Sequence, residues 1–311
     1  MSCNLGFGAW QIGGQHSVNG RVNGWNVGDA QKCIRLVHSA IDIGVTFFDT
    51  AQGYGEGRSE QLIGQAIQSN QARDKVTICT KIPIPADWTA TSANYSHVEN
   101  LIMKSCQNLQ VDCLDILLLH NPKKEVLIPQ LKGVLESLAK RGLIGSFGVS
   151  ASTLDVLKFA SETDFGHYFE WNYSVFERRF ETDFAKILRQ RKQCFIGRSP
   201  LFRGLITESF LRDGPANYFS DVRSQLPQDL LTWCHKQISK IAPIADSMDL
   251  SVSELAIAYA YSNDDLFCTI PGVSKTEHIK SIDKILNLNH TTMQAIKNID
   301  LGDELCFPKF L

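Results

Sequence analysis

The feature that most constrains the fold is a pattern that recurs eight times along the 311 residues. Each unit begins with a short β-rich apolar run, continues through a loop and ends in an amphipathic stretch of helical periodicity. Strand character is found at residues 5–10, 46–49, 75–81, 114–120, 145–150, 168–173, 194–199 and 266–271. Helical patterns occupy residues 30–43, 58–69, 98–109, 126–140, 153–161, 183–191, 229–248 and 252–261. This alternation predicts a single-domain (β/α)8 TIM barrel formed by residues 1–311, since a doubly wound sheet would need fewer strands and a division in the chain.

Several local signals support the predicted helix ends. Gly44 and Gly142 are placed as C-terminal caps before the next strand. Ser251 and Glu254 have the spacing of a capping box. Strand one begins almost at once, which leaves no room for a hairpin that plugs the barrel floor.

The glycines of residues 6–14 invite comparison with a dinucleotide-binding fingerprint. Their spacing does not give G-x-G-x-x-G, and no helix follows them directly. A Rossmann domain is therefore disfavoured. We expect these glycines to let the backbone approach a ligand at the barrel mouth.

Charge and cysteine usage exclude some classes of partner. A net charge of −2 gives no reason to expect nucleic acid or an anionic membrane surface. No stretch of about 18 apolar residues predicts a membrane span, and the first residues lack the features of a signal peptide. Nine cysteines without a C-x-x-C pair are typical of free thiols in a reducing cytoplasm.

Four ionisable residues stand at strand ends or on the loops that follow them. Asp49 closes one predicted strand and Tyr54 lies on the next loop, while Lys81 and His120 close the following two strands. Residues at the C-terminal ends of barrel strands meet at one mouth and carry chemistry. A buried lysine is costly unless it is paired, so Asp49 is its expected partner.

A cationic Lys81 beside Tyr54 is expected to lower the phenol pKa from its usual value of about 10. A neutral His120 can donate a hydrogen bond to a carbonyl oxygen. Together these groups suit proton transfer at a carbonyl or alcohol oxygen while hydride moves at the carbon.

The chain resembles the aldo-keto reductase family from residue 5 to about 282. The matching motifs are D-T-A-Q-x-Y-G, a strand ending T-K, L-L-L-H-N-P, G-V-S, S-P-L-x-R-G-L-I-T and T-I-P-G-V, in that order. The resemblance implies a (β/α)8 barrel that binds NADP(H) without a Rossmann domain. It also implies that Tyr54 is the proton donor, that Lys81 and Asp49 tune it, and that His120 orients the carbonyl.

The same resemblance implies a cofactor site. Its residues are Gly8, Trp10, Asp49, Ser150, Glu170, Arg198, Ser199, Leu201, Arg203, Gly204, Gly272, Ser274, Lys275 and His278. Five positions depart from the family pattern. Ala151 replaces an asparagine, Glu170 a glutamine, Arg198 a tyrosine that stacks on nicotinamide, His278 an arginine for the 2′-phosphate, and Ile282 an asparagine at the adenine. Asn172 is an alternative source of the missing amide, and NADP(H) is favoured with NAD(H) possible.

Substrate contacts are expected from Trp25, Trp88, His120 and Asn121, with Trp171, Phe202 and the tail at 306–311 as further candidates. They indicate a partly apolar carbonyl substrate, a small molecule. The alternative is a regulatory or scaffold protein that binds the cofactor on the same barrel with little turnover. A metal hydrolase is disfavoured because neither H-x-H nor H-E-x-x-H occurs. A short-chain-type dehydrogenase is disfavoured because no tyrosine has a lysine four residues later.

Overall fold

The computed structural model describes residues 4–18, 20–89, 92–216 and 219–300. Parallel strands form a barrel in the order β1-β11-β10-β9-β8-β7-β6-β5-β2. Their bounds are β1 (Asn4–Leu5), β2 (Phe7–Gly8), β5 (Phe47–Asp49), β6 (Thr77–Ile82), β7 (Leu114–His120), β8 (Ile144–Ser150), β9 (Tyr168–Asn172), β10 (Cys194–Arg198) and β11 (Cys268–Ile270). β1 and β2 are the two halves of the first predicted strand. Because β1 pairs with β11 and β2 pairs with β5, the sheet closes on itself, and the predicted (β/α)8 barrel is confirmed.

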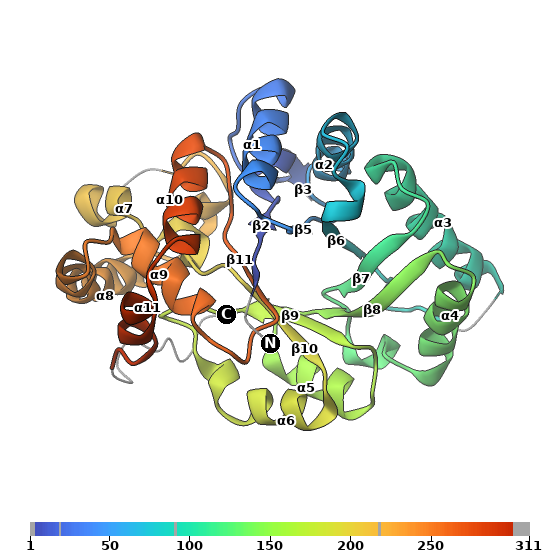
Figure 1. Cartoon of the computed structure of the whole chain (residues 1–311). Coiled ribbons are helices and arrows are strands. Elements are labelled where there is room, and N and C mark those ends of the chain that lie inside the picture. Colours follow the sequence, from blue (N-terminus) through green and yellow to red (C-terminus); the bar gives the residue numbers. More distant parts are fainter. Residues whose placement is uncertain (1–3, 19, 90–91, 217–218, 301–311) are drawn as a thin grey trace.

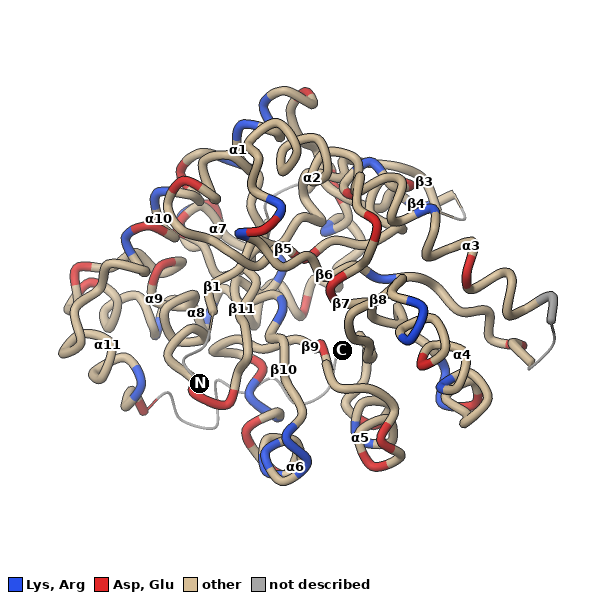
Figure 2. Tube along the Cα trace, turned by 45° about the vertical axis from the view of Figure 1, so that its right-hand side comes forward, with Lys and Arg blue, Asp and Glu red and all other residues tan. Residues whose placement is uncertain are grey.

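Helices surround the strands as an outer ring (Figure 1). They are α1 (Ala30–Asp42), α2 (Arg58–Ser69), α3 (Ser92–Leu109), α4 (Pro129–Lys140), α5 (Leu154–Glu162), α6 (Asp183–Arg191), α7 (Glu208–Asp213), α8 (Gln228–Ser247), α9 (Val252–Tyr261), α10 (Thr276–Leu286) and α11 (His290–Lys297). Among the described residues, none of these helices is long and apolar enough to cross a membrane. Figure 2 shows acidic and basic residues interspersed over the ring, so neither sign predominates there.

The predicted helix ends have the expected local chemistry. Ser251 and Glu254 form the capping box at the start of α9. Gly44 and Gly142 take φ of 94° and 79°, the left-handed conformation that glycine allows after a helix. Two predicted starts are displaced. The helix predicted from residue 98 begins at Ser92 as α3. The helix predicted from residue 126 begins at Pro129 as α4, because proline suits the first helical turn, and residues 124–126 form a separate 3-10 turn.

Some elements were not predicted. An antiparallel hairpin, β3 (His16–Val18) with β4 (Arg21–Asn23), occupies the loop after the first strand. Short α7, and α10 and α11 beyond the last strand, also had no counterpart in the predicted pattern. In the described part of the chain this two-stranded antiparallel sheet therefore follows the first barrel strand.

The barrel interior has an apolar floor. Its packed cluster comprises Phe47, Cys79, Ile116, Leu118, Ile196, Cys268 and Ile270. Side chains alternate between the two faces of a strand, so residues two positions further along also face the interior. Asp49 lies two positions after Phe47, Lys81 two after Cys79, and Arg198 two after Ile196, so these three charged residues face the interior as well. The fold thereby places charged groups directly above an apolar floor, at the C-terminal mouth.

Candidate active site

Lys81 is the buried centre of the site. Its side chain has no exposed surface, and its ammonium donates hydrogen bonds to a carboxylate oxygen of Asp49 and, at 3.0 Å, to the backbone oxygen of Thr50. The predicted pairing of Lys81 with Asp49 is therefore confirmed. A second carboxylate lies 3.2 Å from the ammonium nitrogen and belongs to Glu170 on β9. Sequence reasoning placed Glu170 near a cofactor and did not foresee this contact.

Tyr54 is held on the loop between β5 and α2. Its backbone N–H donates to the Ala51 oxygen at 3.0 Å, and Gly55 follows with φ of 63°. A Cβ at Gly55 would come within 2.0 Å of the Gly13 oxygen, so only glycine fits there. The Tyr54 ring stacks on Trp10 at 5.9 Å between centroids, which fixes the phenol above the buried lysine.

The phenol lies close to the two other predicted groups. The Lys81 ammonium nitrogen is 5.2 Å from the centre of the Tyr54 ring, and the His120 ring meets it edge-on at 5.8 Å. The structure thus brings Asp49, Tyr54, Lys81 and His120 together at one end of the barrel.

The protonation state of Tyr54 differs from expectation. Burial raises the pKa of Tyr54 to about 12, although the charge of Lys81 acts to lower it. The expectation that Lys81 brings the phenol pKa below its usual value is therefore wrong, because the loss of hydration outweighs the attraction. At neutral pH the phenol is protonated and can serve as a proton donor.

The imidazole of His120 is neutral. Burial and the nearby positive charge of Lys81 lower the pKa of His120 to about 3. The neutral ring predicted from the sequence is therefore the form present at neutral pH. Its N–H is available to a carbonyl oxygen placed beside the Tyr54 hydroxyl.

A cavity of about 340 Å³ opens at this mouth and extends away from Tyr54. Of the predicted site residues, those that line it are Gly8, Trp10, Trp25, Asp49, Tyr54, Arg198, Ser199, Leu201, Arg203, Gly204, Gly272, Ser274, Lys275 and His278. Lining residues that were not predicted include Gln11, Asn26, Asp221 and Arg223. Asp221 and Arg223 form a two-point ion pair at 2.9 and 2.7 Å, and no motif in the sequence marked them.

One end of the cavity carries positive charge that the described part of the chain does not neutralise. Within the described ranges, no carboxylate lies within ion-pair distance of Arg203 or Lys275. Burial, with the neighbouring Arg198, lowers the pKa of Arg203, as expected for a cation without a counter-charge. The loop is shaped by left-handed residues, with φ of 47° at Phe202 and 59° at Arg203. Backbone of this kind can turn consecutive N–H groups toward an anion.

His278 is half-buried beside Lys275. Its Nδ1 accepts a hydrogen bond from the backbone N–H of Ser274 at 3.3 Å, and burial lowers its pKa. The ring is therefore neutral, with the proton on Nε2, so it can donate one hydrogen bond and carries no charge of its own.

Ile282 is buried in the apolar core, and the other three departures from the family pattern, at Ala151, Glu170 and Arg198, lie next to one another. Ser150 donates its hydroxyl to Glu170 at 2.9 Å. Arg198 donates to the backbone oxygen of Ala151 at 3.2 Å, and its Nε lies 3.6 Å from the Glu170 carboxylate. Ser150 and Glu170 are buried and do not line the main cavity, while Asn172 lines a separate small cavity.

The predicted substrate residues divide into two groups. Trp25 lines the main cavity and packs edge-on against Trp10 at 5.7 Å. Trp88 is buried but does not line that cavity, and Asn121 lines a separate surface pocket with Lys123 and Lys124. Trp171 and Phe202 are buried in the apolar core. The tail at 306–311 lies outside the described residues.

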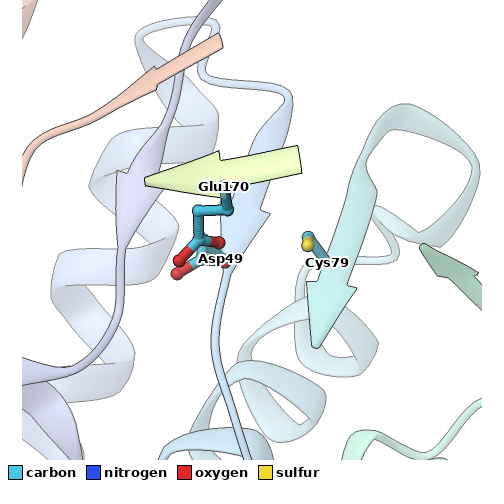
Figure 3. A group of neighbouring side chains, drawn as sticks. All are labelled: Asp49, Cys79 and Glu170. Atoms are coloured by element: carbon cyan, nitrogen blue, oxygen red, sulfur yellow. The ribbon is translucent and has the colours of Figure 1, made fainter. Parts of the chain in front are cut away.

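Three buried groups resemble a metal-binding cluster. Asp49, Cys79 and Glu170 place one ligand atom each within 4.8 Å of one another (Figure 3). The cation at this point is the Lys81 ammonium, which both carboxylates contact. The cluster is therefore explained by the lysine.

Comparison with known proteins identifies the family. The model of the Aldo/keto reductase family matches residues 4–301. Aldo-keto reductase YhdN of Bacillus subtilis is 26% identical over 307 residues, which cover 95% of this chain and 89% of that protein. The NADH-specific methylglyoxal reductase of Escherichia coli is 24% identical over 320 residues, covering 97% and 95%. A solved aldo/keto reductase from Klebsiella pneumoniae, in complex with NADP and acetate, matches with a TM-score of 0.69 at 21% identity, covering 94% and 89%. Because the family model spans nearly the whole chain, this protein belongs to the aldo/keto reductase family.

Proposed function

We propose that this protein is an NADP(H)-dependent oxidoreductase that reduces an aldehyde or ketone to an alcohol, or runs the reverse reaction. The observation that carries the proposal is a protonated phenol, Tyr54, held between a buried ammonium and a neutral imidazole at the base of a large cavity. This is the arrangement that proton delivery to a carbonyl oxygen requires.

The cavity fits a dinucleotide phosphate. Arg203 and Lys275 are cations without a counter-charge among the described residues, and anionic phosphates would supply it. When bound, the reduced nicotinamide supplies the hydride. Ser199, Leu201 and Gly204 lie on the same loop as Arg203 and line the cavity beside it.

The roles of the chain's own residues follow from their protonation states. Tyr54 donates its proton to the carbonyl oxygen, and the Lys81 charge stabilises the phenolate that this leaves. His120 donates a hydrogen bond to the same oxygen and so orients the carbonyl. Asp49 holds the Lys81 side chain toward the phenol. Trp10 and Trp25 form an aromatic wall of the cavity, with their rings packed edge-on.

The choice between NADP(H) and NAD(H) rests on Lys275. Among the described residues, Lys275 is the cation whose charge acts on His278, and His278 itself is neutral. The similar proteins differ in their cofactor, since one was solved in complex with NADP and another is NADH-specific. We favour NADP(H), and Lys275→Ala should narrow the difference in KM between NADPH and NADH.

We also propose a cytoplasmic setting for the reaction. The cysteines in the described ranges are free thiols, which reducing compartments maintain.

A panel of aldehydes, ketones and alcohols, assayed with NADPH and with NADH, tests the function. The expected result is turnover of at least one carbonyl, faster with NADPH. Nicotinamide fluorescence should be titrated in parallel. Tight cofactor binding without turnover of any member of the panel would contradict the proposal and favour the regulatory or scaffold alternative.

A further inference from the structure

The second carboxylate beside Lys81 has no role in the reaction described above. Glu170 is fully buried, and its Oε2 lies 3.2 Å from the Lys81 ammonium nitrogen. Its other oxygen accepts the hydrogen bond from Ser150. Figure 3 shows the Glu170 carboxylate turned toward that of Asp49, and one oxygen of each lies within 4.8 Å of the other. Two buried carboxylates therefore converge on one buried ammonium.

The charges at this buried site do not balance if both carboxyl groups are ionised. If both carboxylates were ionised, the buried site would carry two negative charges against the single positive charge of Lys81. The next cation is Arg198, whose Nε is 3.6 Å from Glu170, but its side chain is 25% exposed and its charge is partly screened by solvent. Neighbouring buried carboxylates commonly resolve such an excess by keeping one proton between them.

Besides Lys81 and Arg198, the described groups that face the pair supply no cation. The facing groups come from the loop after β5 and from β6, β7, β8 and β10, and they are Tyr54, Cys79, Lys81, His120, Ser150 and Arg198. Burial raises the pKa of Tyr54 and of Cys79 and lowers that of His120, so these three are neutral near pH 7. Within the described residues, Lys81 and Arg198 are thus the cations that balance the pair.

The pKa values of the two carboxyl groups are shifted in opposite directions. Burial, and then the charge of Glu170, raises the pKa of Asp49 well above its usual value. Burial also disfavours ionised Glu170, but the charges of Lys81 and Arg198 outweigh it and lower the pKa of Glu170. A raised pKa at Asp49 and a lowered pKa at Glu170 agree with one proton on the pair, held mainly by Asp49.

We propose that Asp49 and Glu170 hold one proton between them beside the Lys81 ammonium, and that Glu170 thereby sets the charge that faces the Tyr54 phenol. The catalytic consequence rests on the proposed function, because it requires Tyr54 to be the proton donor. Glu170 is then a positioning residue that acts through Lys81. While the pair keeps its proton, one negative charge balances Lys81. When the pair loses that proton at higher pH, an added negative charge makes the phenol a weaker acid.

Infrared difference spectroscopy of the full chain at pH 7 tests the shared proton without any turnover. Glu170→Gln preserves the side-chain shape and leaves Asp49 as the sole carboxylate beside Lys81, where it should ionise. The expected difference is loss of one protonated-carboxyl C=O band with no net loss of carboxylate. Loss of one carboxylate with every protonated band retained would overturn the proposal, because the protonation of Asp49 would then not depend on Glu170 and the two groups would share no proton.

Glu60→Gln is the matched control. Glu60 on α2 is also fully buried, but its oxygens accept hydrogen bonds from Thr80 at 2.7 Å and Asn108 at 2.9 Å. This variant should keep the band that Glu170→Gln removes. If Glu170→Gln does not fold, as judged by circular dichroism, Asp49→Asn provides the mirror experiment and should remove the same band.

The dependence of kcat on pH gives a second readout. The parent protein should show a fall in carbonyl reduction where the pair loses its proton, and Glu170→Gln should lack that fall. An identical profile in both would contradict the role assigned to Glu170. Failure of the proposed function can be told apart from failure of this inference. If no member of the carbonyl panel is turned over, the proposed reaction is wrong, but the infrared test of the shared proton is unaffected.

Discussion

Replacement of Lys81 by methionine removes the charge that the account places beneath the phenol. Lys81 lies 5.2 Å from the centre of the Tyr54 ring. At an effective dielectric constant of about 20, unit charges at this distance interact by about 3 kcal/mol, equivalent to about two pKa units. If the phenolate is half formed in the transition state, about half of that energy is lost. We therefore expect kcat for aldehyde reduction to fall by between about tenfold and about two-hundredfold.

The assay is carbonyl reduction at saturating NADPH, with circular dichroism to verify the fold. A fold check is needed because removing one partner of a buried ion pair costs about 3–5 kcal/mol unless the remaining carboxylates take up protons. Lys186→Met, which replaces an exposed lysine on α6, is the control and should leave kcat unchanged. A folded Lys81→Met protein that retained kcat within about threefold would refute the electrostatic role of Lys81.

Three further outcomes follow from the same geometry. Gly55→Ala should lower the free energy of unfolding by more than about 1 kcal/mol, because its φ of 63° and the 2.0 Å approach leave no room for a Cβ; Gly133→Ala, which meets no neighbour within 4 Å, should be neutral or stabilising in the same urea titration. Arg203→Ala should raise the Kd for NADPH by about tenfold or more, measured by fluorescence, whereas Arg212→Ala, which removes an exposed arginine paired with its neighbour, should not; equal effects would contradict the phosphate site. The depressed pKa of His120, about 3, means that the unfolded state binds a proton there below pH 6.5 while the folded state does not. Its contribution to stability is therefore present above pH 6.5 and lost as the pH falls toward 3, and replacement by glutamine should flatten that part of the stability profile. A kcat profile with an inflection near pH 6.5 that disappears in this variant would contradict a neutral His120.

Much of the site follows from local rules. Asp49 and His120 end their strands and Lys81 is the last residue but one of β6, each two positions beyond an apolar residue of the barrel floor. The period of two and the closure of the barrel therefore bring them to one mouth. The pairing of Lys81 with Asp49 could be predicted because a buried ammonium requires a partner, and the two strands are neighbours.

Other features depend on contacts between distant segments. Glu170 reaches Lys81 from a strand that is not adjacent to β6, and its position is set by the stagger of the whole barrel. The burial of Tyr54, which reverses the expected direction of its pKa shift, depends in part on Trp10, which lies in the turn after β2. Asp221 and Arg223 reach the cavity through a segment without periodic pattern, whose Val222 N–H donates to the Gly24 oxygen at 3.2 Å. No local signal in the sequence encodes such a contact.

The central claim is that Tyr54 delivers the proton, and its removal is the most direct test. Tyr54→Phe deletes one hydroxyl, and Tyr168→Phe deletes a half-buried hydroxyl at the other end of the barrel interior. Both variants should bind NADPH as the parent protein does. With a carbonyl that the parent reduces, Tyr54→Phe should lower kcat by at least about a hundredfold, since general acid catalysis commonly contributes 10²–10⁴-fold, and Tyr168→Phe should leave kcat unchanged. Full activity in Tyr54→Phe would contradict the account.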